Sequence, residues 1–433
     1  MQIEETDKKT PYCYNMETYA TYSLFPENEK FSKRYVSTKI CVSPSASYKI
    51  YNYDKTILSC LDTIHNQYRS VVCSYPENKL LCFSPPKSME YCDFIKKYPK
   101  MIESPNKKGE LPIKNIIATE KIEGISIQLF YDERIGSWEI STKTNISGNY
   151  WYFNNERQNT TTFRDMFMDA LIHDRSSSLN TNPWINILPK SHCYSFVLQH
   201  PENQIVLPLK RPKLWLIAIY RIVISKESLA IQIPSFEYKN WRIFNDIIGI
   251  VDFPKELNVE TYEELQKYVL KYKNHPFRLS KGIVIWNEKT GERTTLNNEN
   301  YKDLVILRSL VPDFQYEYLC MKRAQKIDEY LQFFPQYKKN VMAMNRLYDD
   351  FVNTLHRCYM DVYVFKTECF DNVSHQYKPH VENLHKKIYL RNLHTRHPVK
   401  ITKKCVSSYI EHMEPREQLY MLSYLRRERD NMY

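Results

Sequence analysis

Glycine is the residue that this sequence lacks most, with 7 among 433 residues, whereas an average protein contains about 7% glycine. Glycine adopts backbone conformations with positive φ at no steric cost, which other residues do not. We therefore expect each of these few glycines to occupy a position where the backbone requires one.

The chain also lacks a long hydrophobic run. Its longest uncharged apolar stretch, residues 214–220, is far shorter than the ~20 residues that cross a bilayer as a helix, which excludes a transmembrane helix. Residues 1–5 contain no basic start followed by an apolar stretch, so they do not resemble a secretion signal. We therefore expect a cytoplasmic protein without a membrane partner.

Cysteine is present, but not in a pattern that indicates bridges or metal. The 11 cysteines are odd in number and form no C-x-x-C pair and no zinc-finger spacing. We expect reduced thiols that pack mostly as small hydrophobic side chains. A structural zinc site built from distant cysteines stays an alternative, although no ligand set is evident.

The composition is that of a folded, basic protein. An apolar share of 42% with 26% charged residues excludes disorder for most of the chain. The 61 basic residues exceed the 50 acidic ones, which gives a net charge of +11. This charge indicates an anionic partner, but it supports nucleic acid only weakly, because many basic proteins bind none.

The pattern divides the chain into three stretches and predicts an α+β fold. Residues 1–110 mix short strands with turns, residues 111–305 are β-rich, and residues 306–433 are helical and basic. The length fits two or three domains.

Individual elements follow from local patterns. Alternation over residues 125–131 predicts a half-buried strand, and residues 138–142 complete a hairpin. Thr261 and Glu264 have the spacing of a capping box, which predicts the one helix of the middle stretch. Helical spacing in the last stretch predicts helices over residues 316–331, 341–364 and 377–390.

A candidate nucleophile occurs at Lys121, in the string Lys121-Ile122-Glu123-Gly124 just before the strand. Covalent transfer of a nucleotide to a protein needs an amine at a sheet edge, a nearby acid, and a glycine that admits the ligand. The string alone is weak, because a solvated lysine before a strand has the same appearance.

The elements around Lys121 resemble the covalent nucleotidyltransferases, and among these the phage-type ATP-dependent RNA ligases and their relatives in large DNA viruses. The family motif K-x-D-G-S resembles residues 121–126, and its S-[KR]-G element resembles residues 141–144, which include Lys143. The F-E-x-x-x-P-x-N-x-I-V strand is similar to residues 196–206, which begin at Phe196, and the E-G-[VIY]-V element to residues 281–284. The match covers about residues 65–305.

The resemblance also implies roles for these residues. Arg69 and Lys87 lie in stretches similar to the family's R-G and P-x-x-K-F elements and would hold nucleotide phosphates. Lys143 would contact the phosphates or the RNA end. The implied nucleotide-binding set is Arg69, Lys87, Glu123, Gly124, Lys143, Phe196 and Lys281, with Lys121 as the nucleophile.

Three features of the family pattern are missing here. Val197 stands where the family has a glutamate that contacts the ribose, and Lys281 stands where it has a metal-associated glutamate. The lysine pair that closes the family's site would fall on Thr295 and Asn297, which carry no charge. Lys281 either replaces a lost cation or has drifted in an unused pocket.

Basic residues gather near the end of the chain with aromatic neighbours. This pattern fits phosphate binding with base stacking, as in RNA binding, and fits a solvated helix end equally well. The candidate RNA-binding residues are Lys386, Lys387, Arg391, Arg396, Lys400, Lys403 and Lys404.

These observations predict an RNA ligase-like enzyme that uses ATP and Mg²⁺ to join RNA 5′-phosphate and 3′-hydroxyl ends, with impaired activity. The alternative is a catalytically degenerate relative that binds RNA or assists assembly in viral RNA metabolism or transcription, at a viral replication site or in a virion, with other viral proteins as partners. A third hypothesis, an mRNA-capping guanylyltransferase, is disfavoured because the C-terminal pattern is helical and shows no OB-fold.

Overall fold

A computed structural model of the chain describes residues 19–25, 34–58, 64–103, 113–150, 161–172, 179–224, 228–245, 251–273, 280–308, 313–395 and 399–430. The chain folds into two compact units, residues 1–305 and 306–433. The fold is α+β, with antiparallel sheets in the first unit and helices in the second, as the pattern predicted.

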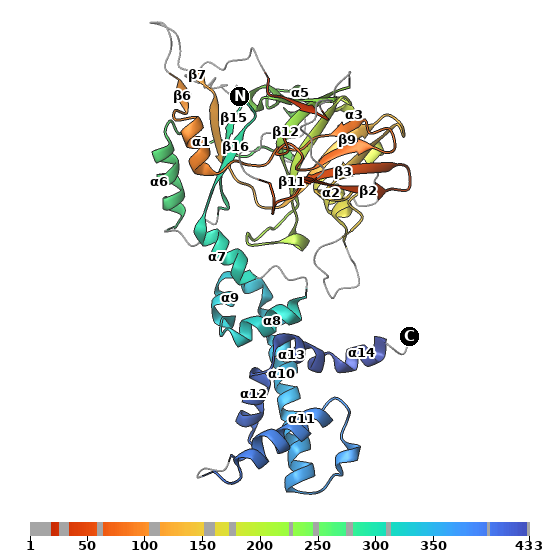
Figure 1. Cartoon of the computed structure of the whole chain (residues 1–433), viewed down its shortest axis with the longest axis vertical. Helices are drawn as coiled ribbons and strands as arrows, with labels where there is room; N and C mark the ends of the chain where they lie inside the picture. Colours follow the sequence, from red (N-terminus) through yellow and green to blue (C-terminus); the bar gives the residue numbers. More distant parts are fainter. Residues whose placement is uncertain are drawn as a thin grey trace, which may run out of the picture. The chain divides into compact units, whose positions relative to one another are not determined.

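The first unit is built on a large antiparallel sheet (Figure 1), whose strands run in the order β1-β13-β12-β11-β9-β10. The short strand β14 pairs with β12 in parallel. The predicted hairpin is confirmed, because β9 and β10 pair directly. The bounds are β1 (Thr21–Leu24), β9 (Ile125–Asp132), β10 (Ser137–Ser141), β11 (His192–Gln199), β12 (Lys213–Ile224), β13 (Ser228–Ile233) and β14 (Val251–Asp252).

Both faces of the large sheet are covered, so the prediction of a half-buried strand over residues 125–131 was wrong. Ile127 and Leu129 pack into a cluster with helix α2 (Phe163–Ile172). Phe130, on the opposite face, packs into a second cluster with strands of a smaller sheet. Gln128 is also buried. The alternation of polar and apolar residues therefore marked two buried faces rather than one.

Two smaller sheets and a separate two-stranded ribbon complete the first unit. Strands β2 (Val36–Val42), β3 (Ser47–Tyr53), β4 (Val71–Ser74) and β5 (Leu80–Cys82) form one sheet. Strands β16 (Arg293–Asn297), β15 (Gly282–Asn287) and β8 (Ile116–Glu120) form the other. The ribbon pairs β6 (Ile102–Glu103) with β7 (Ile113–Lys114).

The first hundred residues belong to the same unit as the β-rich stretch after them. Strand β1 pairs with β13 of the large sheet, and the β2–β5 sheet packs on that sheet's face. The β-rich stretch of residues 111–305 therefore shares its large sheet and its core with these earlier strands.

More than one helix interrupts the β-rich stretch, contrary to the prediction. The helices are α2, α3 (Pro183–Ile187), α4 (Ser235–Tyr238), α5 (Arg242–Asn245) and the predicted α6 (Tyr262–Lys273). Thr261 caps α6 by accepting a bond from the Glu264 N–H at 3.3 Å, but the Glu264 carboxylate accepts from the N–H of Glu260 instead. Helices α1 (Tyr91–Lys97) and α6 pack on β15 (Figure 1).

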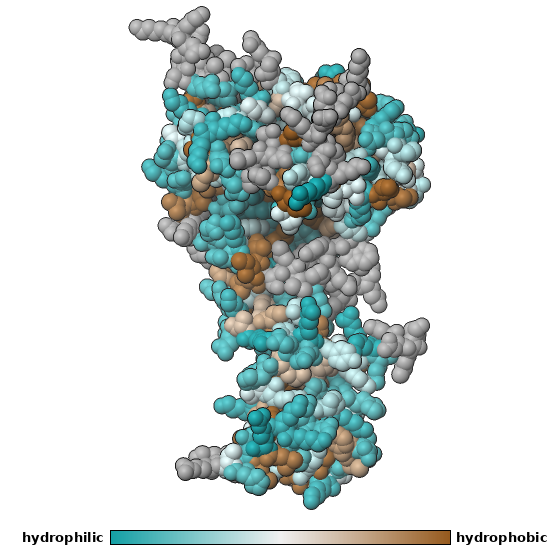
Figure 2. Space-filling view, viewed as in Figure 1, coloured by the Kyte–Doolittle hydropathy of each residue, from teal (hydrophilic) through white to brown (hydrophobic). Residues whose placement is uncertain are grey.

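The second unit is helical within its described residues, and Figure 2 shows mainly hydrophilic side chains on its visible face. The prediction of a single helix over residues 316–331 was wrong, because two helices occupy this stretch. It is divided after α8, where Gln325 has a φ of 56° and the next helix begins at Ile327. The helices are α7 (Glu299–Arg308), which enters this unit, α8 (Phe314–Arg323), α9 (Ile327–Phe333), α10 (Lys338–Tyr359), α11 (Lys378–Asn383), α12 (Lys403–Glu411), α13 (Pro415–Leu422) and α14 (Tyr424–Asp430).

The other two predicted helices of this unit are confirmed, but each ends in a π-helical segment. Helix α10 continues as the π-helical segment η4 (Met360–Val364), and α11 continues as the π-helical segment η6 (Leu384–Leu390). No described helix combines the length and the apolar character that crossing a membrane requires. Nine cysteines in the described part have free thiols, and Cys13 and Cys60 lie outside it.

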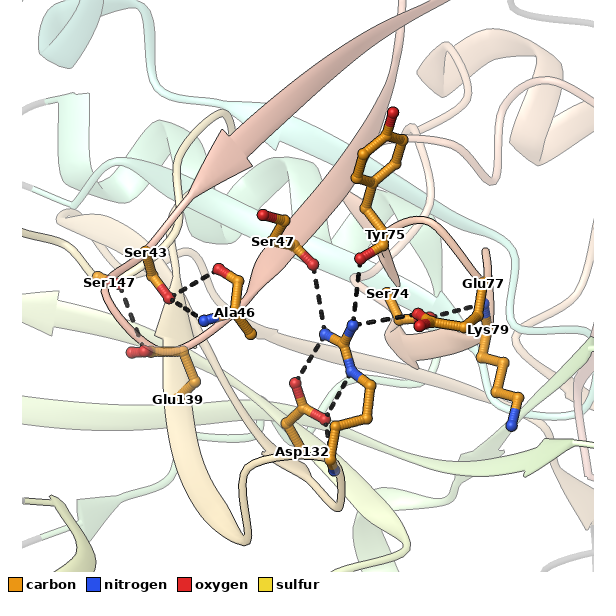
Figure 3. Close-up of polar contacts among 11 residues, drawn as sticks. Ser43, Ala46, Ser47, Ser74, Tyr75, Glu77, Lys79, Asp132, Glu139 and Ser147 are labelled. Carbon is orange, nitrogen blue, oxygen red and sulfur yellow. Dashed lines mark hydrogen bonds and ion pairs between the residues drawn. The ribbon is translucent and has the colours of Figure 1, made fainter.

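An arginine in the β9–β10 turn connects the large sheet to the β2–β5 sheet. Arg134 forms two bonds to the fully buried Asp132 carboxylate, at 3.1 and 2.9 Å. Its guanidinium also donates to the carbonyls of Ser47 and Tyr75 and to the Glu77 carboxylate. Figure 3 shows Asp132 facing these groups of the smaller sheet. The arginine therefore neutralises a buried carboxylate and fixes the two sheets together.

We predict that Arg134→Ala lowers the free energy of unfolding of the first unit by about 3 kcal/mol, because it leaves the Asp132 carboxylate buried without its partner. Urea titration followed by tryptophan fluorescence measures this unit alone, since all six tryptophans lie within residues 1–305. Lys97→Ala is the control, because it breaks an exposed ion pair with Glu292 and should cost less than about 1 kcal/mol. Equal effects of the two changes would contradict the role assigned to Arg134.

Candidate nucleotide-binding site

A pocket of about 420 Å³ lies between the large sheet and the β16-β15-β8 sheet of the first unit. Strands β9, β11, β12 and β13 line one side, and strands β8, β15 and β16 line the other. The volume falls in the range of about 300–1,000 Å³ that is typical of small-molecule sites. Lys121 is one of the lining residues.

The backbone holds Lys121 at the end of β8, where the chain leaves the small sheet. Its N–H donates to the carbonyl of Gly282 at 2.9 Å, and its ammonium donates to the Asn297 side-chain oxygen at 2.7 Å. Burial, followed by the charges of Lys281 and Arg293, lowers the pKa of Lys121 to about 8. About a tenth of this lysine is therefore a neutral amine at pH 7, far more than for an ordinary lysine, and the neutral amine is the nucleophilic form.

Two of the few glycines allow the strands around Lys121 to approach one another. Gly124 has a φ of +148°, and a Cβ there would lie 2.3 Å from the Leu198 carbonyl oxygen. Gly282 has a φ of +136°, and a Cβ there would lie 2.3 Å from the Leu296 carbonyl oxygen. Both contacts are far inside van der Waals distance, so the expected backbone reason for a glycine is confirmed at these two positions.

The pocket is strongly cationic. Sequence reasoning selected Arg69, Lys87, Lys143 and Lys281 beside Lys121, and the structure brings all five to this one pocket. It missed three more cations. Among the described residues, the lining contains eight lysines and arginines: Lys55, Arg69, Lys87, Lys121, Lys143, Lys239, Lys281 and Arg293.

Arg293 is the most informative of the missed residues. It is 8% exposed, donates to the carbonyls of Pro85 at 3.2 Å and Pro86 at 2.9 Å, and lies over the Trp286 ring. Burial, followed by the charge of Arg69, lowers its pKa to about 9. Alternate residues of a strand face the same side, so Arg293 shares a face of β16 with Thr295 and Asn297. The signal in the sequence that could have identified Arg293 was its position two residues before Thr295, on the same face of the strand.

Lysines also gather around a tyrosine at the pocket wall. The ammonium groups of Lys87 and Lys143 lie 5.8 and 5.5 Å from the centre of the Tyr53 ring. Burial, followed by the charges of Lys55 and Arg69, lowers the pKa of Lys143 to about 8. Lys87 donates to the Leu58 carbonyl at 2.9 Å, so part of its hydrogen-bonding capacity is used within the protein.

Lys281 is half-buried beside these groups. Burial lowers the pKa of Lys281, and the nearby Arg69 lowers it further, while Glu123 opposes both effects. A lysine in this environment is stabilised by any anion that enters the pocket.

Glu123 occupies a different place from the predicted one. Its carboxylate is 2% exposed and is not in the pocket lining. It accepts bonds from the Tyr301 hydroxyl at 2.7 Å and from the N–H groups of Val206 and Leu207. These contacts fix the segment after β11 beneath the pocket. Gly124 and Phe196 do line the pocket, and so does Val197.

Carboxylates are few here. Glu120 and Glu288 are the acidic residues that the pocket lining contains within the described part of the chain. No described cluster of three or more His, Cys, Asp or Glu residues could hold a metal ion. Mg²⁺ is usually bound through one or two carboxylates together with substrate phosphates. These two carboxylates therefore fit a metal ion that arrives bound to nucleotide phosphates, with Glu120 or Glu288 as its protein ligand. They do not fit a metal site whose ligands all come from the protein.

The candidate RNA-binding residues lie in the helical unit, apart from this pocket's lining. Lys386, Lys387, Arg391 and Lys404 are exposed, and Lys386 pairs with Glu382. Arg396 lies outside the described residues. Lys400 and Lys403 are exposed and line a second pocket within that unit.

No protein-family model matches the chain. An RNA ligase of Rhodothermus phage RM378 is 23% identical to it over 318 residues, which cover 67% of this chain and 69% of the ligase.

Solved ligase structures are also similar. An archaeal ATP-dependent RNA ligase has a TM-score of 0.39 at 9% identity, with 65% of this chain and 62% of the other covered. A putative ATP-dependent DNA ligase from Aquifex aeolicus has a TM-score of 0.38 at 11% identity, with 72% and 68% covered. An RNA ligase of Naegleria gruberi has a TM-score of 0.31 at 14% identity over 44% of this chain, which spans about half the length of that protein.

The phage relative and the order of motifs around Lys121 agree with each other. The motifs come from separate strands, and the structure assembles them around one pocket. In sequence the chain is similar to a phage RNA ligase, and its motifs resemble those of the phage-type RNA ligases in the superfamily of covalent nucleotidyltransferases.

Proposed function

We propose that this chain transfers AMP from ATP to Lys121 and uses it to join RNA 5′-phosphate and 3′-hydroxyl ends. The observation that carries the proposal is Lys121 itself, a lysine of lowered pKa that lines a nucleotide-sized pocket with seven further cations. An amine of this kind is suited to attack phosphorus, and cations of this number are suited to hold a triphosphate.

In the first step the neutral Lys121 amine attacks the α-phosphorus of ATP. A bond forms between the lysine nitrogen and phosphorus, the bond from that phosphorus to the bridging oxygen breaks, and pyrophosphate leaves. The proton that the nitrogen loses passes to solvent. AMP is then transferred to an RNA 5′-phosphate, and a 3′-hydroxyl displaces it as the RNA strands join.

The cations of the pocket would offset the charge that develops on the phosphates. Arg69, Lys143, Lys281 and Arg293 all line it. Removal of one group that stabilises such charge typically costs a factor of about 10²–10³ in rate. A divalent metal that arrives with ATP would add Lewis-acid stabilisation. Lys281 would stand in as a fixed positive charge where the related ligases have a metal-associated glutamate.

A specific observation favours the alternative, a relative that binds RNA without sealing it. Val197 lines the pocket where a ribose-binding glutamate would be expected, and Asn297 is occupied with the Lys121 ammonium. Such a protein would keep the fold and its RNA contacts and would act as an RNA-binding or assembly factor, with other viral proteins as partners. A guanylyltransferase would require GTP in place of ATP.

We predict covalent labelling of Lys121 when the protein is incubated with α-labelled ATP and Mg²⁺. Lys121→Met should abolish the label, whereas Lys79→Met, an exposed lysine in the β4–β5 turn, should not change it. Labelling is measured by gel autoradiography, and peptide mass spectrometry identifies the modified residue. A label from GTP alone would indicate guanylyl transfer, and no label from either nucleotide would favour the degenerate alternative.

We also predict the pH dependence of this labelling. The pKa of Lys121 is lowered to about 8, so the amine is protonated and inactive below that pH and neutral above it. The labelling rate should rise about tenfold per pH unit below pH 8 and level off above it. Lys281→Met removes a neighbouring positive charge and should move the midpoint to higher pH, while Lys79→Met should leave it in place. A profile without a midpoint between about pH 7 and 9 would contradict the lowered pKa.

Changing the charge at residue 281 tests its role directly. If Lys281 contacts phosphates, Lys281→Glu should weaken ATP binding by about tenfold or more, whereas Lys281→Arg should retain it. Isothermal titration calorimetry with ATP measures both. Unchanged binding or increased labelling by Lys281→Glu would show that a carboxylate serves this position equally well, as in the related ligases.

A further inference from the structure

The helical unit contains a second pocket, of about 530 Å³. Its lining combines aromatic rings with lysines and contains no aspartate or glutamate among the described residues. The rings and lysines that define its chemistry are Tyr359, Tyr363, His385, Tyr389, Lys400 and Lys403.

Two irregular helical segments build this pocket. Met360, Tyr363 and Val364 come from η4, and His385 and Tyr389 come from η6. A π-helical turn is wider than an α-helical one, and such turns occur frequently at functional sites. Both π-helical segments of the described chain thus contribute to one pocket.

Three rings in this pocket form a stack, which we call the ring stack (Tyr363, His385 and Tyr389). The centres of the Tyr363 and His385 rings are 3.7 Å apart, with an angle of 4° between their planes. The His385 and Tyr389 rings are 5.4 Å apart at 19°. All three residues are partly exposed, and near-parallel rings offer a flat surface on which a planar ligand can stack. Burial lowers the pKa of His385, so its ring is neutral at neutral pH.

Tyr359 closes the inner side of the ring stack. It is 3% exposed, and its hydroxyl lies 3.5 Å from the Nδ1 of His385. Its ring centre lies 5.4 Å from that of Tyr363. The buried tyrosine therefore supports the stack from within and leaves the lysines to form the outer edge of the pocket.

The outer edge is positively charged. Lys400 and Lys403 line the pocket and are exposed to solvent, and Lys403 is the first residue of α12. The partial positive charge of a helix N-terminus adds to theirs. A ligand that fits has a planar apolar part for the rings and negative charge for the lysines.

We propose that this pocket binds an unpaired base of a single-stranded RNA, stacked on the ring stack, with its neighbouring phosphates at Lys400 and Lys403. This proposal depends on the function proposed above in one respect, the choice of RNA as the nucleic acid that binds. Aromatic stacking accepts any base, and lysines hold the backbone, so the site would hold the strand without selecting its sequence. An acidic peptide would satisfy the lysines but has no planar group that requires three near-parallel rings.

Binding of the full chain to a fluorescent single-stranded oligoadenylate, measured by anisotropy without ATP, tests this proposal. Tyr389→Ala should weaken binding by about tenfold, whereas Tyr389→Phe keeps the ring and should bind nearly as the unchanged chain does. Lys403→Ala should weaken binding more than Lys339→Ala, which removes an equal charge from an exposed lysine of α10 that does not line the pocket.

A strand of the same length without bases separates stacking from charge. The Tyr389→Ala effect should disappear with this abasic strand, and the Lys403→Ala effect should remain. Val364→Glu is a second variant that should not disturb the fold, because Val364 is 52% exposed at the pocket. The change places a negative charge where the phosphates would lie. It should weaken binding to both strands.

Two results would overturn the proposal. One is that neither Tyr389→Ala nor Val364→Glu weakens the binding of oligoadenylate. The other is that Tyr389→Ala lowers the affinity for the abasic strand as much as the affinity for oligoadenylate. Because no ATP is present, this failure is distinct from a failure of Lys121 labelling, and either can occur while the other succeeds.

Discussion

The close approach of two backbones at Gly124 and Gly282 is the constraint on which the site depends. Each glycine lies directly beneath a carbonyl oxygen of a neighbouring strand, where any side chain would collide. The carbonyl of Gly282 also accepts the N–H of Lys121, so the strand that needs this glycine is the strand that holds Lys121. The large sheet and the three-stranded sheet meet around this lysine, and the pocket is the space that they leave between them.

Positive charge is the second constraint. Segments between the strands bring most of the lysines and arginines together, and in the described part of the chain eight cations line the pocket with two carboxylates. Partial burial of like charges is unfavourable, which is why the pKa values of Lys121 and Lys143 fall to about 8 and that of Arg293 to about 9. An anion in the pocket relieves this repulsion. The same electrostatics that lower the stability of the empty pocket favour a bound polyphosphate and leave Lys121 partly neutral.

The sequence alone was sufficient where the signal is local. The segments around Arg69, Lys87, Lys121, Lys143 and Lys281 each resemble a short family motif, and these motifs gave five of the eight cations that line the pocket among the described residues. Lys55 and Lys239 could not be selected in this way, because only the tertiary fold brings their surrounding loops to the pocket. Sequence reasoning also assumed that an acid next to the nucleophile faces the ligand, whereas Glu123 bonds to backbone N–H groups and to Tyr301. The break after α8 was missed because residues 324–326 contain neither glycine nor proline to mark it.

The departures from the ligase pattern take on a different meaning in three dimensions. Thr295 and Asn297 lack the expected charges, but Arg293 supplies one from the same face of β16, and Lys281 supplies another from the position just before β15. Asn297 retains a role as the acceptor for the Lys121 ammonium. Positive charge therefore lies at different positions of the pocket from those of the family pattern, and the lining stays cationic. A pocket without a ligand would gain stability by losing partly buried cations, because the few carboxylates near them cannot offset the solvation that so many cations lose. Their presence together supports a site that binds an anionic ligand over a fold that has lost its ligand.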